Sequence, residues 1–118
     1  MFITRWQGLP TMEEAAEFFG EYRAVLERLQ PGEKVVVITD FTNAERPGPD
    51  IRKFVGESFR NLGDLRKHVV NSYLVVSSAM VRGAVTAASW IAPSMKTITM
   101  VATFDDAMNK AKADLDAL

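Results

Sequence analysis

The stretch Val35-Val36-Val37-Ile38 decides the fold class of this chain. All four residues are apolar and β-branched, which favours a strand. A strand with one face in water alternates between apolar and polar residues, and this stretch does not alternate. We therefore expect a strand covered on both faces, as in a parallel sheet that carries helices on each side. Asp40 marks the carboxyl end of this expected strand.

A strand and a helix are expected before this segment. The first strand spans residues 2–6, and the sequence leaves open whether it runs parallel or antiparallel at the sheet edge. Thr11 and Glu14 have the spacing of a capping box, which satisfies free amides at a helix start. Apolar residues then recur three and four positions apart, which is typical of an amphipathic helix. Pro31-Gly32 is expected to end this helix.

Similar strand–helix units follow after Asp40. Residues 41–49 are expected to form a loop, because they are rich in turn formers. A second amphipathic helix is expected next, with its end near Gly63, and a third strand over residues 73–76. Apolar positions of that helix are Ile51, Phe54, Val55, Leu62 and Leu65.

The last third of the chain repeats the pattern once more. Residues 80–91 are expected to form a helix that is apolar around most of its circumference, and Pro93 ends it. Residues 97–102 are expected to form the fourth strand. Thr103 and Asp106 have N-cap spacing for a closing helix. Four βα units in series predict an α/β fold with a mainly parallel four-stranded sheet and helices packed on it.

The composition indicates one ordinary globular domain over residues 1–118. Hydrophobic residues make up 47% and charged residues 25% of the chain, and the formal net charge is −1. This balance does not favour nucleic acid or an acidic membrane surface as a partner. The chain has no cysteine, and no apolar run is long enough to span a bilayer. We expect a cytoplasmic protein without a signal peptide or transmembrane segment.

Several local motifs run along nearly the whole chain. They are Trp6-x-Gly8-x-x-Thr11-x-Glu13-Glu14, Phe18-Phe19-x-x-Tyr22, the strand ending in Asp40, Ser77 to Ala87 followed by Trp90, and Thr103-Phe104-Asp105-Asp106-Ala107. Together they resemble a group of small bacterial proteins described as SpoIIAA-like, or STAS/Sec14-like. The resemblance implies the SpoIIAA-like (STAS-type) fold. It also implies a non-catalytic role, because better-known STAS relatives act by binding protein partners.

The phosphorylation switch of those relatives is not carried over to this chain. That switch is an Asp-Ser-Ser/Thr-Gly turn after a central strand. Here the corresponding stretch is Asp40-Phe41-Thr42-Asn43-Ala44-Glu45, in which only the aspartate matches. The resemblance therefore implies the architecture without implying the regulation of a sigma factor.

Polar residues at the ends of the second and third strands are candidates for ligand binding. Strand ends are where open α/β sheets bind ligands, and helix N-termini favour anions. A small anionic, nucleotide or lipid ligand is the expected class. The opposing interpretation is local: a serine caps a helix, an aspartate closes a turn, and an arginine stays solvated. The candidates are Asp40, Thr42, Ser77, Ser78 and Arg82.

No catalytic, metal or cofactor site is expected. His68 is the only histidine, and no cysteine or recognisable carboxylate spacing accompanies it. No nucleophile elbow accompanies Ser77 or Ser78. The basic residues between positions 46 and 67 are interrupted by Asp50, Glu57 and Asp64, which disfavours nucleic acid.

The apolar third helix is the candidate interface. An exposed apolar patch on it would mark a site of protein interaction or of homodimer formation. We therefore expect a non-catalytic regulatory or protein-interaction module, with a small-ligand binder as the alternative. The candidate interface residues are Met80, Val81, Trp90 and Ile91.

Overall fold

A four-stranded sheet in the order β1-β2-β3-β4 forms the centre of the computed structural model, which describes residues 1–45, 47–76 and 98–118. All three pairs of neighbouring strands are parallel. The expectation of a mainly parallel sheet is confirmed, and the first strand is parallel to its neighbour. The strands of the sheet are β1 (Phe2–Gly8), β2 (Val35–Ala44), β3 (Val69–Val75) and β4 (Ile98–Val101).

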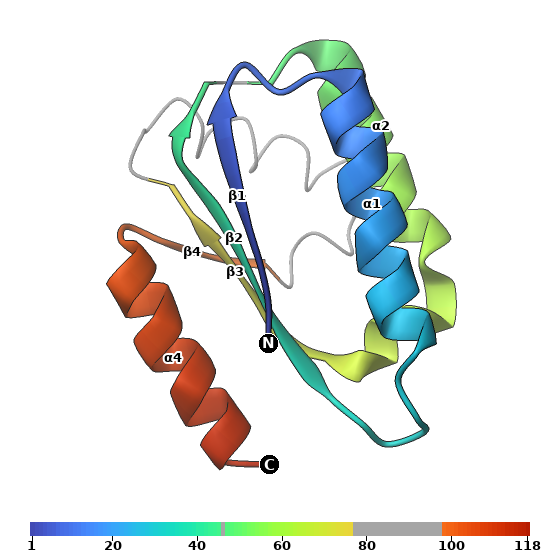
Figure 1. Ribbon diagram of the computed structural model, residues 1–118, viewed down its shortest axis with the longest axis vertical. Helices are drawn as coiled ribbons and strands as arrows, with labels where there is room; N and C mark the ends of the chain where they lie inside the picture. The colour runs from blue at the N-terminus through green and yellow to red at the C-terminus, as the bar shows by residue number, and fades with distance from the viewer. Residues whose placement is uncertain (46, 77–97) are drawn as a thin grey trace.

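Helices cover both faces of this sheet (Figure 1). One face carries α1 and α2, which contact each other, and the other carries α4. None of the helices in these ranges is long and apolar enough to cross a bilayer. The helices are α1 (Met12–Glu27), α2 (Pro49–Asn61), the 3₁₀ segment η1 (Gly63–His68) and α4 (Phe104–Asp116). The expected helix over residues 80–91 lies outside the described residues.

The expected capping residues begin the helices α1 and α4. The Thr11 hydroxyl accepts a hydrogen bond from the Glu14 amide (3.1 Å), and the Thr103 hydroxyl accepts one from the Asp106 amide (3.1 Å). Each bond satisfies an amide that has no partner within its helix. At the end of α2, Gly63 adopts a φ of 55°, a left-handed conformation that glycine tolerates best.

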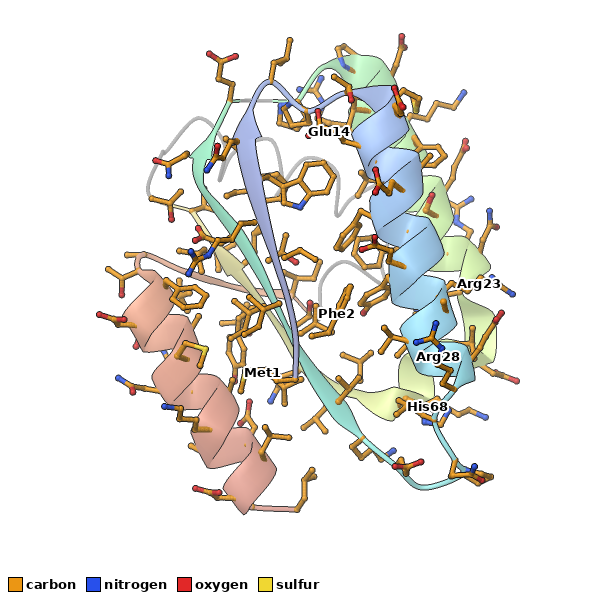
Figure 2. All side chains as sticks on the ribbon, viewed as in Figure 1. Met1, Phe2, Glu14, Arg23, Arg28 and His68 are labelled. Atoms are coloured by element: carbon orange, nitrogen blue, oxygen red, sulfur yellow. The ribbon has the colours of Figure 1, made fainter. Side chains whose placement is uncertain are left out.

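The central strand β2 is buried on both faces, as expected. Val36 and Ile38 have 0% exposure and pack towards α4, whereas Val37 has 1% exposure and packs towards α1. Phe2 follows the same alternation, because it pairs with Val37 and lies between β1 and α1 (Figure 2). The alternation therefore separates two hydrophobic cores.

Two expectations about the strand boundaries are wrong. The third strand, expected over residues 73–76, already begins at Val69. Residues 41–44 belong to β2, and the expected loop is correspondingly shorter. The strand continues because β1 also extends to Gly8, which supplies it with a pairing partner up to Ala44. Phe41 contributes by stacking on Trp6, with ring centroids 5.3 Å apart.

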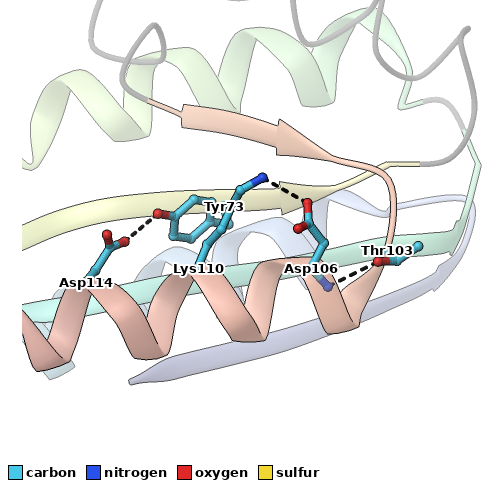
Figure 3. Close-up of polar contacts among 5 residues, drawn as sticks. All are labelled: Tyr73, Thr103, Asp106, Lys110 and Asp114. Atoms are coloured by element: carbon cyan, nitrogen blue, oxygen red, sulfur yellow. Dashed lines mark hydrogen bonds and ion pairs between the residues drawn. The ribbon is translucent and has the colours of Figure 1, made fainter.

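A polar contact joins α4 to the sheet (Figure 3). The buried Tyr73 hydroxyl of β3 donates a hydrogen bond to the Asp114 carboxylate of α4. The Asn71 amide donates a second bond to the same carboxylate oxygen (2.9 Å). These bonds fix the position of α4, whose Ala107 and Ala111 allow it to approach the sheet closely.

The two tyrosines of the chain should resist ionisation while it is folded. Burial, followed by the hydrogen bond to Asp114 and its charge, raises the pKa of Tyr73 to about 12. Burial alone raises the pKa of Tyr22 to about 12. The unfolded chain releases both phenolic protons near pH 10.0, so folding free energy is lost as the pH rises from about 10 to 12.

Phenolate absorbance and urea unfolding across this alkaline range would test the expectation. Tyr73→Phe should flatten the pH dependence of stability, and Tyr22→Phe should flatten it further. Ionisation of either tyrosine at its ordinary pKa in the folded protein would contradict this assignment.

Candidate functional site

An apolar pocket lies between the sheet and the pair of helices α1 and α2. Its cavity has a volume of ≈ 90 Å³ and is partly open to solvent. For comparison, an engineered apolar cavity of about 150 Å³ remains dry and binds benzene or xenon. The pocket is therefore large enough for part of a small apolar molecule.

Aromatic rings form much of the pocket wall. β1 and β2 contribute Trp6 and Phe41, α1 contributes three rings, and α2 contributes Phe59. Phe19 and Phe59 meet edge to face with centroids 5.0 Å apart, a geometry that aromatic pairs favour. The three rings of α1 belong to Phe18, Phe19 and Tyr22.

Aliphatic side chains complete the wall, and polar groups are few. Thr39 and Ser72 contribute hydroxyl groups and are each 9% exposed. Arg52 is the one charged side chain among the described lining residues. A pocket that is mainly apolar and has a few placed polar groups is typical of a small-molecule site. The aliphatic and proline residues are Pro10, Val37, Pro47, Ile51, Val55, Leu74 and Ile98.

Asp40 lies at the carboxyl end of the sheet, where the sequence placed it, but it does not line this pocket. It pairs with Arg5 on β1 and with Val75 on β3. The alternation of side chains directs it to the face that carries α4. Arg5 lies on that face too, with its guanidinium carbon 4.8 Å from the centre of the Phe104 ring.

The Asp40 carboxylate is engaged in local structure. The Thr42 amide donates a hydrogen bond to Oδ1 (2.9 Å), and the Thr42 hydroxyl donates another (2.5 Å). Arg5 Nε lies 3.7 Å from Oδ2. The register between β1 and β2 shifts here. Arg5 pairs with Asp40 and Gln7 pairs with Asn43, so β2 advances three residues while β1 advances two. Asp40 thus makes an Asx-type turn that satisfies an amide at a β-bulge.

The structure describes two of the candidate ligand residues and leaves the other three outside its described ranges. Asp40 and Thr42 are hydrogen-bonded to each other, and their binding of a ligand stays a prediction. The other candidate ligand residues, Ser77, Ser78 and Arg82, lie outside the described residues. The candidate interface, formed by Met80, Val81, Trp90 and Ile91, lies outside them as well.

His68 lies at the junction between η1 and β3. Its Nδ1 is 2.9 Å from the Glu33 carbonyl oxygen, which fixes that nitrogen as the hydrogen-bond donor. Within residues 1–45, 47–76 and 98–118, no group of three or more histidine or carboxylate side chains is placed to hold a metal ion.

The sequence patterns predicted neither the pocket nor the position of Arg52 in its wall. Ile51, Val55 and Phe59 recur at spacings of four along α2 and indicate one helical face, so the apolar side was visible in the sequence. That pattern does not reveal whether such a face packs tightly or leaves a cavity. The cavity depends on how the aromatic rings of α1 and α2 pack against each other over one face of the sheet.

Comparison with known proteins supports the fold. Neither a family model nor a curated protein matches the chain. A solved structure does match, with a TM-score of 0.61, 14% identity, and coverage of 92% of this chain and 82% of the other. That protein is an uncharacterised member of the DUF3478 family from Shewanella loihica PV-4 with a SpoIIAA-like fold. The chain therefore has a SpoIIAA-like α/β fold, as the sequence motifs implied.

The role of Asp40 in the bulge can be tested by substitution. Asp40→Ala should lower the free energy of unfolding by about 1 kcal/mol, because the Thr42 amide loses its acceptor. Asp40→Asn retains an acceptor oxygen and should lose less. Urea unfolding measures both effects, with Asp116→Ala at the exposed end of α4 as the control. Equal stability of Asp40→Ala and the unsubstituted chain would show that the turn does not need this carboxylate.

Proposed function

We propose that this chain is a non-catalytic binding module for a small, mainly apolar ligand. The observation that supports this proposal is the aromatic pocket between the sheet and helices α1 and α2. The ligand would transfer apolar surface from water into this pocket, with a gain of about 0.8 kcal/mol for each buried methylene group. Lipid-type molecules with a single chain are the class that fits such a wall.

The engagement of Asp40 supports the non-catalytic part of the proposal. A general base needs a free carboxylate within reach of a substrate proton. The Asp40 carboxylate accepts two bonds from Thr42 and lies near Arg5, so it is engaged in local structure. We also propose a reducing, cytoplasmic setting, which the absence of cysteine from all 118 residues supports.

A pocket-filling substitution provides the test. Val55→Phe should weaken the binding of decanol at least about tenfold, because the added ring occupies the space of the ligand. Stability should be retained or raised, since the ring fills a cavity. Leu9→Phe is the matched control, because Leu9 is 58% exposed and is not part of the pocket wall.

Two measurements would show the effect. Isothermal titration gives the affinity, and NMR chemical shifts of the Val37 and Leu74 methyl groups report where the ligand lies. The proposal fails if decanol does not bind to the unsubstituted chain, or if Val55→Phe binds it as tightly as Leu9→Phe does.

Self-association is a second candidate function, and the exposed edge strand β1 favours it. β1 pairs only with β2 in the described sheet. Met1 is 44% exposed and Ile3 is 41% exposed. Ile3 pairs with Ile38, which places it on the face that carries α4. Edge strands with apolar side chains are common sites of pairing between chains, so we propose β1 as the contact in a homodimer.

Light scattering of concentrated protein tests this second candidate. The unsubstituted chain should have the mass of a dimer, and Ile3→Glu should shift it towards the monomer because a charge would be buried in the interface. Glu13→Gln, an exposed change on α1, serves as the control. A monomer at every concentration, or a dimer that Ile3→Glu leaves intact, would contradict the proposal.

A further inference from the structure

We infer that the ligand of the aromatic pocket is a single-chain amphiphile with an anionic head group, and that Arg52 binds this head group. The inference rests on the proposed function and specifies its ligand. An apolar tail would lie among the rings, and a carboxylate or phosphate would meet the guanidinium.

Arg52 has unused hydrogen-bonding capacity. Its side chain is half-buried and donates one bond from Nη1 to the Pro47 carbonyl oxygen (3.4 Å). In the part of the chain that the structure describes, no carboxylate lies within ion-pair distance of it. A guanidinium has five N–H donors in a planar fork that matches a carboxylate or phosphate. Among the described residues, most of these donors therefore have no partner and could meet a ligand.

The backbone holds Arg52 at one end of the pocket. Its amide donates to the Gly48 carbonyl oxygen (3.0 Å) in the first turn of α2. This turn lies beside the carboxyl ends of β1 and β2 (Figure 1). Asp50 lies in the same turn, but it is exposed and does not line the pocket. A head group at Arg52 would consequently leave the tail directed towards Val37 and Phe59.

Charges on the other side of the aromatic wall favour this orientation. A shallow hollow beside α1 shares Trp6 and Phe18 with the pocket. Three glutamates and one cation, Arg5, line it, so its net charge is negative. This net charge would repel an anionic head group placed there. The glutamates are Glu14, Glu17 and Glu21. The anionic end of a ligand is therefore expected at Arg52, away from this hollow.

A series of ligands that share one tail tests the inference. Decanoate, decyl phosphate, decanol and decylamine are titrated below their aggregation concentrations near neutral pH. Decanoate or decyl phosphate should bind about tenfold more tightly than decanol, and decylamine more weakly than decanol. The better of the two anions identifies the head group.

Substitution at position 52 separates the head-group interaction from the pocket. Arg52→Gln should reduce the affinity for the anion to about that for decanol, whereas Arg52→Lys should keep part of the preference. Lys53→Gln is the matched control, because Lys53 is exposed on the same helix and does not line the pocket.

The outcomes distinguish the two proposals. Equal binding of anion, alcohol and amine, or an anion preference that survives Arg52→Gln, would overturn the role of Arg52 while the apolar pocket stands. Tightest binding of decylamine would overturn it too and point to the glutamate-lined hollow. Absence of binding by every compound with this tail would overturn the proposed function and the inference together.

Discussion

The burial of β2 on both faces is the constraint on which the rest of the structure depends. Residues 35–39 are at most 9% exposed, so every side chain in this run needs cover. Helices on both sides of a parallel sheet provide that cover. Right-handed crossovers between parallel strands place helices against the faces of the sheet. The layered architecture therefore follows from a strand without a polar face.

The two faces of the sheet are packed by different means. On the α4 side, Ala107 and Ala111 are fully buried, and Asp114 accepts bonds from Tyr73 and Asn71. The small residues let α4 approach the sheet closely, and the polar contact fixes its position. On the opposite side, bulky rings from α1 and α2 meet edge to face and leave a cavity of ≈ 90 Å³. The candidate site is a consequence of this difference.

Much of the fold could be predicted from local sequence. The β-branched run at Val35 and the capping threonines Thr11 and Thr103 indicated elements that the structure contains, because each signal acts over a few residues. The extension of β2 through residues 41–44 was missed. It depends on pairing with β1 and on the Trp6–Phe41 stack, contacts between segments far apart in the sequence.

The candidate site was less predictable for the same reason. Asp40 was placed at a strand end, but its side chain faces α4 and serves a bulge that no local pattern shows. Arg52 looked like one of several surface cations in the sequence. The role proposed for Arg52 rests on its apolar surroundings in the pocket. It also rests on the lack of a carboxylate within ion-pair distance among the described residues. These are properties of the assembled layers.

Xenon diffraction tests the central claim most directly, because xenon binds in dry apolar cavities without needing a polar contact. The account predicts that crystals held under xenon pressure show a bound atom among Phe19, Val37 and Val55, between the sheet and the α1–α2 pair. A cavity filled by hydrogen-bonded water, or packing of the rings that leaves no room for xenon, would contradict it.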